Sequence, residues 1–385
     1  MYDVAVVGAG PSGTALSYFL TLRGFKVLTL ERDPVPSLRT ICGEYLPDPN
    51  SLQMDGDAGS AYFNFFKPFI LHRMSRVVME IGRRRFSADF AGYSVDRKLM
   101  IRERLRESME GGADLRVGEA FISYVRRSEG FEIMTSKGRY ESRYLVGADG
   151  FESRVARIFG IRWEMRCDDV ALAFADEVNI RLDDPDEMRL IINERLAPGT
   201  YAWVIPRSPQ RANVGVGVRL NMKEKFDPRS ALQDLFRMLG VEGNPKVRGR
   251  YVPAGGMPRR VAQDNVFLVG DSAGMTIPSN GGGMHTGILA AYLLSRSLDD
   301  ENPIESYLRK VEKIIKPMVD IGLVHRRAAD FLMRTGLLWR TVDLLPEAMV
   351  KEVMEVKKGV YYPILKALSI LYGLVVGRVG SYPAC

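Results

Sequence analysis

The sequence predicts an α/β protein with three parts: a parallel-sheet domain assembled from separate stretches of the chain, a second domain on an antiparallel sheet, and a helical C-terminal region. Three observations predict this. A strand, a glycine-rich turn and a helix open the chain; two later apolar strands each end near an aspartate; the remaining segments are first β-rich and then helical. The expected boundaries are 1–70, 95–160 and 253–300 for the first domain, 71–94 and 161–252 for the second, and 301–385 for the helical region.

Length and composition are those of an ordinary globular chain. Its 385 residues are enough for two or three domains. Hydrophobic residues make up 46% and charged residues 26%, which excludes a disordered chain and a polytopic membrane protein. The net charge is +7, yet no run of five basic residues occurs, so we expect no nucleic-acid partner.

The cysteines and the N-terminus indicate the cellular compartment. Cys42, Cys167 and Cys385 include no CxxC pair, which predicts neither a disulfide framework nor a zinc site, and we expect no metal. The chain enters a strand-like run soon after Met1, without the charged and apolar segments of a signal peptide. A cytoplasmic protein is therefore expected.

The first elements contain a glycine-rich fingerprint. A buried strand is predicted at Val4–Val7, and Gly8-Ala9-Gly10-Pro11-Ser12-Gly13 follows it directly. Helical spacing of apolar residues continues over Thr14–Arg23, and a second strand at Phe25–Leu30 ends on Glu31. This order of strand, GxGxxG turn, helix and strand is typical of a Rossmann-type dinucleotide-binding domain.

The spacing has a physical explanation. Gly8 allows the tight turn, Gly10 lets a pyrophosphate approach the backbone, and Gly13 lets helix and strand pack closely. Ser12 lies in the same turn, at a helix N-terminus whose free N–H groups favour phosphate, and is included among the candidate ligands. Glu31, 18 residues after Gly13, is placed to accept hydrogen bonds from a ribose. These residues alone do not decide between FAD and NAD.

Two later segments indicate which cofactor binds. Tyr144–Gly150 is an apolar strand that closes on Asp149, and Asn265–Gly274 is another that leads into Asp271. Both carboxylates are expected at the C-terminal edge of the sheet, where ligands bind in open α/β folds. Asp271 there is suited to hold the hydroxyls of a ribityl chain, or alternatively to cap a turn.

A third segment, Gly281-Gly282-Gly283-Met284, opens a helix predicted over Met284–Leu298. Its glycines let backbone N–H groups reach a flat ring, and the helix N-terminus favours the negative charge of a reduced flavin. Gly282, Gly283 and Met284 are therefore candidate flavin contacts, and FAD is the expected cofactor.

Taken together, the GxGxxG turn with Glu31, the Gly-Ala-Asp-Gly segment and the Gly-Asp segment resemble FAD-dependent oxidoreductases of the p-hydroxybenzoate hydroxylase fold. The resemblance covers about the first 300 residues. It implies that Arg97, before a helix predicted at Lys98–Gly111, contacts FAD. It also implies that the backbone of Ala120 faces the adenine side.

The second domain carries a more specific motif. Pro198-Gly199-Thr200-Tyr201-Ala202-Trp203-Val204-Ile205-Pro206, followed by the glycine-rich Ala212–Gly217, resembles the geranylgeranyl reductase family, with Ile205 in place of the family phenylalanine. Cys42-Gly43-Glu44 resembles the Cys-Gly found near the flavin in that family. Strands are expected at Val170–Phe174, Met188–Ile192, Tyr201–Ile205, Val214–Leu220 and Lys246–Val252, with a helix at Pro228–Gly240.

In a strand, Tyr201, Trp203 and Ile205 point to one face and would form an apolar and aromatic wall, unless they are ordinary core residues. An uncharged polyprenyl chain must be bound by apolar contact, at about 25 cal/mol per Å². Cys42, Tyr201 and Trp203 are the candidate catalytic residues. Cys42 is an expected proton donor, with Glu44, His285 or water as alternatives.

The resemblance implies an FAD-dependent reductase that saturates C=C bonds of a geranylgeranyl chain, with an archaeal-type ether phospholipid as the expected carrier of that chain. Three alternatives stay open: a flavin-dependent monooxygenase or halogenase on the same fold, a prenyl-quinone side-chain reductase, and a flavin-bound lipid carrier. No second GxGxxG occurs, so an external electron donor is expected, either ferredoxin or a reduced nicotinamide or deazaflavin.

The C-terminal region is helical and apolar from Pro303 onward. Its longest uncharged stretch near the end, Ala367–Gly377, is too short for a spanning helix, which needs about 20 residues. Lys357, Lys358 and Lys366 precede it and Arg378 follows it. This pattern fits either an interfacial helix on the inner face of an anionic membrane or a buried helix with snorkelling ends. His72 and His325 have no ligand-spaced partner and are interpreted as structural.

Overall fold

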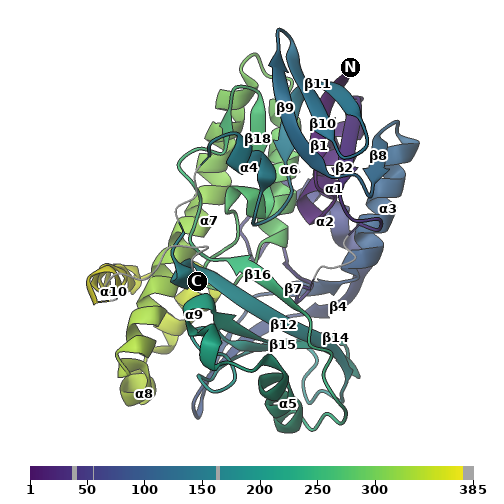
Figure 1. Ribbon diagram of the computed structural model, residues 1–385. Coiled ribbons are helices and arrows are strands. Elements are labelled where there is room, and N and C mark those ends of the chain that lie inside the picture. Colours follow the sequence, from purple (N-terminus) through teal and green to yellow (C-terminus); the bar gives the residue numbers. More distant parts are fainter. Residues whose placement is uncertain (37–40, 55, 162–164, 376–385) are drawn as a thin grey trace.

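A computed structural model describes residues 1–36, 41–54, 56–161 and 165–375 of the chain (Figure 1). An eight-stranded sheet forms the upper part of Figure 1, and its spine has the order β17-β18-β11-β1-β2-β8. The neighbours from β18 to β8 run parallel, while β10 and β9 extend from β11 as an antiparallel hairpin. The strands are β1 Tyr2–Val7, β2 Val27–Glu31, β8 Asp114–Val117, β9 Phe121–Arg127, β10 Gly130–Thr135, β11 Arg139–Gly147, β17 Ala262–Gln263 and β18 Val266–Leu268.

The helices of this part follow the predicted pattern. The helix α1, Pro11–Thr21, begins directly after the glycine-rich turn and packs against both α3, Arg97–Glu110, and α6, Met284–Ser297. The strand β1 is buried from Val4 onward and is paired on both sides, which explains its continuous run of apolar residues. The strand–turn–helix–strand prediction is confirmed.

A second, seven-stranded sheet crosses the lower part of the molecule in the order β16-β12-β15-β14-β13-β5-β6. It is antiparallel, as expected, except that β13 and β5 pair in parallel. The exception arises because β5 comes from a distant part of the chain, before the helix α3, and joins the open edge of β13. The strands are β5 Arg76–Ile81, β6 Arg84–Ala88, β12 Val170–Asn179, β13 Glu187–Ile192, β14 Ala202–Ser208, β15 Arg211–Arg219 and β16 Gly249–Pro253.

Smaller elements connect and cover the two sheets. A three-stranded sheet has the order β3-β7-β4, with β3 at Tyr45–Pro47, β7 at Gly92–Val95 and β4 at Ile70–Met74. The helix α5, Pro228–Met238, packs on β12 and β15, and its apolar side is buried in the core of the second domain. Two further α-helices precede the C-terminal region in the described chain: α2, Gly56–Phe66, and α4, Arg154–Ile158.

The C-terminal region is helical, as predicted. The helix α7 begins at Pro303 and runs to Arg334, along the side of both sheets (Figure 1). It packs against α6 near its start and against α10, Tyr362–Val375, further on. The helices α8, Leu337–Thr341, and α9, Glu347–Glu355, lie between them in sequence. No helix in the described part of the chain is both long and apolar enough to cross a bilayer.

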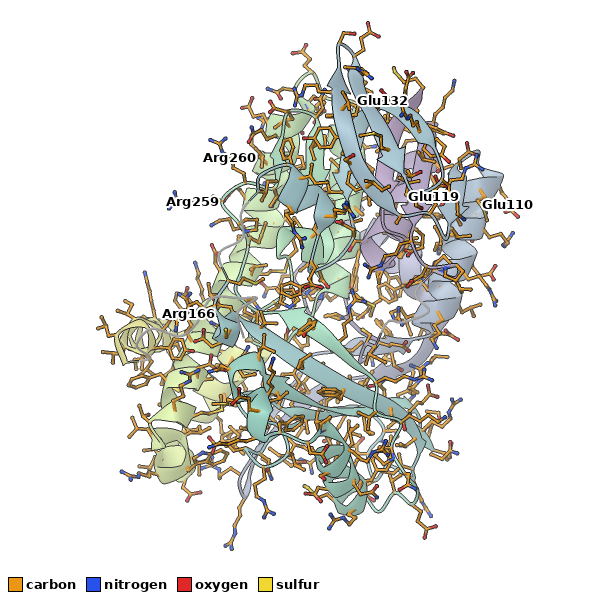
Figure 2. The ribbon with its side chains drawn as sticks, in the orientation of Figure 1. Glu110, Glu119, Glu132, Arg166, Arg259 and Arg260 are labelled. Atoms are coloured by element: carbon orange, nitrogen blue, oxygen red, sulfur yellow. The ribbon has the colours of Figure 1, made fainter. Side chains whose placement is uncertain are left out.

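Charged side chains are spread over the outside of the molecule. Figure 2 shows Glu110, Arg166 and Arg259 at separate places on its outline. The strands of the first sheet come from residues 2–147 and 262–268, and those of the second from residues 76–88 and 170–253. The division of the chain into folding domains stays a prediction.

Candidate active site

One cavity of about 1040 Å³ brings the predicted site residues together. It is bounded by the C-terminal ends of β1 and β2, the second sheet, α7 and the N-terminus of α6. Every candidate catalytic or cofactor-binding residue named above lines it, except Gly13. Among the described residues, no group of three or more His, Cys, Asp or Glu side chains could hold a metal ion.

The glycine-rich turn fits a phosphate-bearing cofactor. A Cβ atom on Gly8, whose φ is +103°, would lie 2.4 Å from the carbonyl oxygen of Ala148. One on Gly13 would lie 1.9 Å from the carbonyl oxygen of Gly8, so Gly13 sits behind the turn and holds it against the sheet. Gly10 has nothing within 4 Å on that side, and therefore leaves open cavity next to the backbone and the start of α1.

Glu31, at the end of β2, lies beside this turn. One carboxylate oxygen accepts a hydrogen bond from the amide of Ala9 at 2.9 Å, and the other accepts one from the amide of Asp33 at 2.9 Å. The carboxylate therefore braces the turn as well as facing the cavity. Each oxygen keeps a second lone pair with which to accept a ribose hydroxyl.

Ala120 and its neighbour Glu119 line the same end of the cavity. The amide of Ala120 donates to Ser136 Oγ at 3.0 Å, and its carbonyl accepts from the amide of Ser136 at 2.9 Å. The buried Glu119, labelled in Figure 2, accepts from the hydroxyls of Thr135 and Tyr140. Since the Ala120 amide is already used, only its carbonyl could make a further contact with an adenine.

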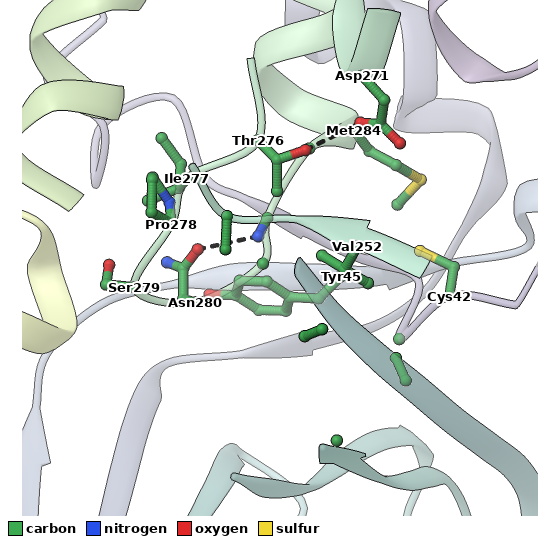
Figure 3. A pocket seen from close by; sticks show the side chains of 18 of the residues that line it. Cys42, Tyr45, Val252, Asp271, Thr276, Ile277, Pro278, Ser279, Asn280 and Met284 are labelled. Carbon is green, nitrogen blue, oxygen red and sulfur yellow. Dashed lines mark hydrogen bonds between the residues drawn. The ribbon is translucent and has the colours of Figure 1, made fainter. Parts of the chain in front are cut away.

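The two aspartates differ in their surroundings. Asp149 accepts hydrogen bonds from Ser153 Oγ at 2.6 Å and from the amides of Arg154 and Val155, so it caps α4. Its burial raises the pKa of this carboxyl above its ordinary value. Within the described part of the chain, the carboxylate of Asp271 accepts one hydrogen bond, from Thr276 Oγ1 at 2.9 Å, as drawn in Figure 3. Asp271 is therefore the better placed of the two to bind a ligand hydroxyl.

The loop before α6 presents backbone donors to the cavity. Asn280 Oδ1 accepts a hydrogen bond from the amide of Gly282 at 2.9 Å, which fixes the loop (Figure 3). The helix α6 follows with Gly283 as its N-cap and no side-chain cap, so the amides of its first turn can bind a ligand. This arrangement fits the pyrimidine edge of a flavin. His285 is buried, and its burial lowers its pKa to about 4, so the ring is neutral and is not an acid at pH 7.

Across the cavity from this loop lies Cys42 (Figure 3). It is a free cysteine, and burial raises the pKa of its thiol, which keeps the thiol protonated at neutral pH. A Cβ atom on Gly43 would lie 2.7 Å from Ile205 Cδ1, so the Cys-Gly turn rests directly on the wall of β14. Glu44 forms ion pairs with Arg97 and Arg207.

The wall of β14 has the predicted orientation. Trp203 and Ile205 face the cavity, whereas Ala202 and Val204, between them in sequence, pack in the core under α5. The rings of Tyr201 and Trp203 are in edge-to-face contact with centroids 6.2 Å apart. The Tyr201 hydroxyl donates to the carbonyl of Asn280, which links the wall to the loop before α6.

Asn213 does not line the cavity but contacts two residues that do, Trp203 and Cys42, and its sequence motif alone did not indicate this. Its Oδ1 accepts from Trp203 Nε1 at 2.9 Å, and its Nδ2 donates to the carbonyl of Cys42 at 3.0 Å. It therefore couples the indole to the cysteine turn. The signal for it was present, because an asparagine among the apolar residues 212–218 of a buried strand needs partners.

The cavity continues from the wall into an apolar arm, which the sequence analysis also missed. This arm lies between the second sheet and the helices α7 to α9. Its side chains are almost all aliphatic or methionine, and they come from distant segments: Val77, Met79, Ile81, Met188, Leu190, Ile192, Leu332, Met333, Leu338, Leu345, Met349, Val350, Val353 and Met354.

The chain has recognisable relatives. The model of the geranylgeranyl reductase catalytic domain matches residues 169–247, and that of the NAD(P)-binding Rossmann-like domain matches residues 6–68. Digeranylgeranylglycerophospholipid reductase 1 of Methanopyrus kandleri is 27% identical, over 92% of this chain and 93% of its own. A protein named digeranylgeranylglycerophospholipid reductase from Methanocaldococcus jannaschii is also 27% identical, over 96% and 97%.

Solved structures share the fold at lower identity. A geranylgeranyl bacteriochlorophyll reductase-like protein from Thermoplasma acidophilum superimposes with a TM-score of 0.74 at 20% identity, covering 96% of this chain and 95% of its own. A probable FAD-dependent monooxygenase from Pseudomonas aeruginosa superimposes with a TM-score of 0.68 at 18% identity, over 88% and 100%. The predicted α/β fold is confirmed, and FAD is the cofactor typical of it.

Proposed function

We infer that this chain, which belongs to the geranylgeranyl reductase family of FAD-dependent oxidoreductases, saturates C=C bonds in the geranylgeranyl chains of an archaeal-type ether phospholipid. The names of its relatives support the substrate class. The observation that carries the proposal is the continuity of one cavity from the glycine-rich turn, past the β14 wall, into an arm lined by aliphatic side chains. A long uncharged chain fits such an arm because it can be bound only by apolar contact.

On the cofactor side, the turn from Gly8 to Gly13 would hold the FAD phosphates and Glu31 the ribose. Asp271 would hold the ribityl hydroxyls, and the amides at the start of α6 the pyrimidine edge. Bound FAD, once reduced, supplies a hydride for one carbon of the alkene.

On the substrate side, Trp203 and Ile205 would hold the alkene flat against the β14 wall, and Tyr201 would fix the wall to the flavin-facing loop. The Cys42 thiol lies beside this wall and is protonated, so it is suited to give a proton to the second alkene carbon. Asn213 holds the cysteine turn through the Cys42 carbonyl. The hydride and the proton together convert C=C into CH–CH.

We also propose contact with the inner face of the cell membrane through α10. This helix is anchored by the buried Leu365 and Tyr372, yet Ile370 and Leu374 on its outer side are 60% and 75% exposed. Such exposure is costly for apolar side chains in water and is typical of an interfacial helix next to cationic residues. The electrons would come from an external ferredoxin or from a reduced nicotinamide or deazaflavin.

A single experiment tests the reaction. The purified protein with FAD is reduced under anaerobic conditions and mixed with digeranylgeranylglyceryl phosphate, and the lipid is then analysed by mass spectrometry. A gain of two hydrogens for each reduced bond is expected. A gain of one oxygen atom that requires air would instead identify a monooxygenase. An unchanged lipid, with flavin that stays reduced, would identify a carrier.

A further inference from the structure

The apolar arm of the cavity reaches the surface where α9 ends and α10 begins. At this rim its lining changes from apolar to charged side chains. Lys357 and Lys358 line the cavity at this point, after the apolar Val353 and Met354 and the intervening Glu355 and Val356, which line it as well. Lys357 Nζ lies 3.0 Å from a carboxylate oxygen of Glu355, and Lys358 has no carboxylate partner among the residues described. Charged side chains such as Arg219, Arg326 and Asp330 also line the cavity, but they are ion-paired with one another or with Asp169. The ammonium group of Lys358 instead stands at the outer end of the aliphatic arm, where apolar substrate chains do not require a positive charge.

A buried polar side chain lies behind this rim. His325, on α7, lines the cavity and is 0% exposed, and neither of its ring nitrogens has a hydrogen-bond partner in the described structure. Its ring makes an edge-to-face contact with Tyr362, at 6.0 Å between centroids, and Lys358 Nζ lies 5.4 Å from the Tyr362 ring. The Tyr362 ring therefore contacts both the buried His325, which lines the cavity, and Lys358 at its rim.

The imidazole is also in a suitable state to bind a ligand. Burial lowers the pKa of His325 to about 4, so at neutral pH the ring has one N–H donor and one acceptor nitrogen. A buried polar group without a partner is destabilising, and such groups are rare unless a ligand or water uses them. The interpretation of His325 as a purely structural histidine does not account for two unpartnered ring nitrogens on a residue that lines a cavity.

The rim is held in place by a fixed connection between the helices. Val356, which ends α9, has φ +54°, an uncommon conformation for a β-branched residue. Glu352 stabilises this turn, because its carbonyl accepts from the amide of Lys357 at 3.0 Å and its carboxylate accepts from the amide of Tyr361 at 3.0 Å. Lys357 and Lys358 therefore stand at defined positions at the mouth of the cavity.

We propose that Lys357 and Lys358, with His325 beneath them, bind the phosphate of the substrate lipid. The prenyl chains would then fill the apolar arm with their ends toward the β14 wall, and the headgroup would stay at the rim beside the exposed face of α10. Two ammonium groups suit a phosphate, and the His325 N–H would donate to a phosphate or glycerol oxygen. This inference rests on the proposed substrate class, but it concerns binding and not turnover.

The test compares two ligands that differ only in the headgroup. Oxidised protein with bound FAD is titrated with geranylgeranyl phosphate and with geranylgeraniol, and binding is measured by calorimetry. In the double variant K357Q/K358Q we expect the affinity for geranylgeranyl phosphate to fall by about tenfold or more, as for the loss of charged hydrogen bonds. The affinity for geranylgeraniol should stay within about twofold of its original value.

The matched control is K351Q/K366Q, which removes the same charge from α9 and α10 outside the cavity and should leave both affinities unchanged. A second variant, His325→Phe, should lower only the affinity for the phosphate, by a smaller factor, while His325→Gln should restore part of it.

Three results would overturn the inference: equal losses for both ligands, an equal loss in the control, or inorganic phosphate alone binding as tightly as geranylgeranyl phosphate. The last would identify a site for free phosphate. If the protein bound geranylgeranyl phosphate selectively but did not reduce the C=C bonds of any prenyl lipid, the phosphate site would be supported and only the proposed function would be refuted.

Discussion

The two ends of the cavity are built in different ways. The cofactor end consists largely of backbone groups: the glycine-rich turn, the amides at the start of α6, and glycines whose Cβ positions are occupied by other atoms. The lipid end consists of side chains from β5, β13 and the helices α7 to α9. A cofactor with phosphates and a polar ring edge is recognised by hydrogen bonds, whereas a prenyl chain is recognised by apolar area. We therefore expect mutations at the cofactor end to lower FAD affinity and mutations at the lipid end to lower lipid binding or turnover, each without the other effect.

The largest effect should come from the glycine-rich turn. Gly10 has φ −72° and nothing within 4 Å of its Cβ position, so Gly10→Val should fold normally while its side chain projects into the cavity. FAD affinity should fall by about 100-fold or more, which corresponds to about 2.7 kcal/mol. Flavin fluorescence titration measures it.

Gly13→Val serves as the comparison. Its Cβ would lie 1.9 Å from the Gly8 carbonyl oxygen, so it should lower the thermal stability of the protein itself. Tight flavin binding by Gly10→Val would show that the pyrophosphate does not lie at this turn.

Next in size is the loss of the hydrogen bond between Trp203 and Asn213. Trp203→Phe keeps an aromatic wall but leaves Asn213 Oδ1 without its donor, and Asn213 positions the Cys42 turn. We expect lipid turnover to fall by about tenfold, or about 1.4 kcal/mol, with FAD affinity unchanged.

Trp339→Phe is the control for this variant, since the Trp339 Nε1 has no hydrogen-bond partner in the described structure and Trp339 does not line the cavity. If Trp203→Phe lowered FAD binding and turnover to the same extent, Trp203 would be a residue of the core alone. The cofactor end and the lipid end would then not be separable at this residue.

A comparable effect is expected at Cys42. Both Cys42→Ser and Cys42→Ala should bind FAD and reduce lipid at least about tenfold more slowly. Burial raises the thiol pKa, so the protonated form persists at higher pH than for an exposed cysteine. Turnover should therefore remain constant as the pH rises through the ordinary thiol pKa of about 8.5, and fall only above it. Turnover within twofold of the original in both variants would remove Cys42 from the mechanism and leave Glu44, His285 or water as the proton source, of which the neutral His285 is the least suited.

The same contrast explains what the sequence could predict. Backbone recognition needs glycines and a carboxylate at fixed spacing, so the turn, Glu31 and Asp271 could be predicted as cofactor contacts from contiguous motifs, and the structure places them on one cavity. The alternation of β14 also predicted the orientation of Trp203 and Ile205, because a strand has a period of two.

The lipid end had no such signal. The parallel pairing of β5 with β13 joins Arg76 to Glu187, and no local pattern records which distant strands will meet. Its lining residues are aliphatic, and they look like core residues in the sequence. Asn213 stands out in its buried strand, but its partner Cys42 lies far away in the chain, and so does Tyr362 from His325. No local sequence pattern records these contacts.

The smallest effect is expected at α10, outside both ends of the cavity. Ile370 and Leu374 are 60% and 75% exposed, so replacing both with serine should leave folding and FAD affinity unchanged. If α10 rests on the membrane, the I370S/L374S variant should bind vesicles of phosphatidylglycerol about fivefold or more weakly in a sedimentation assay, because it loses apolar area that the interface would cover.

The control is L22S/M238S, which changes two comparably exposed apolar residues, Leu22 directly after α1 and Met238 at the end of α5. Reduction of lipid dispersed in detergent should be the same in all three proteins, since neither pair lines the cavity. Equal vesicle binding by the α10 variant and the control would show that the exposed face of this helix does not meet the membrane. Lipid would then have to enter the cavity past Lys358 without contact between α10 and the membrane.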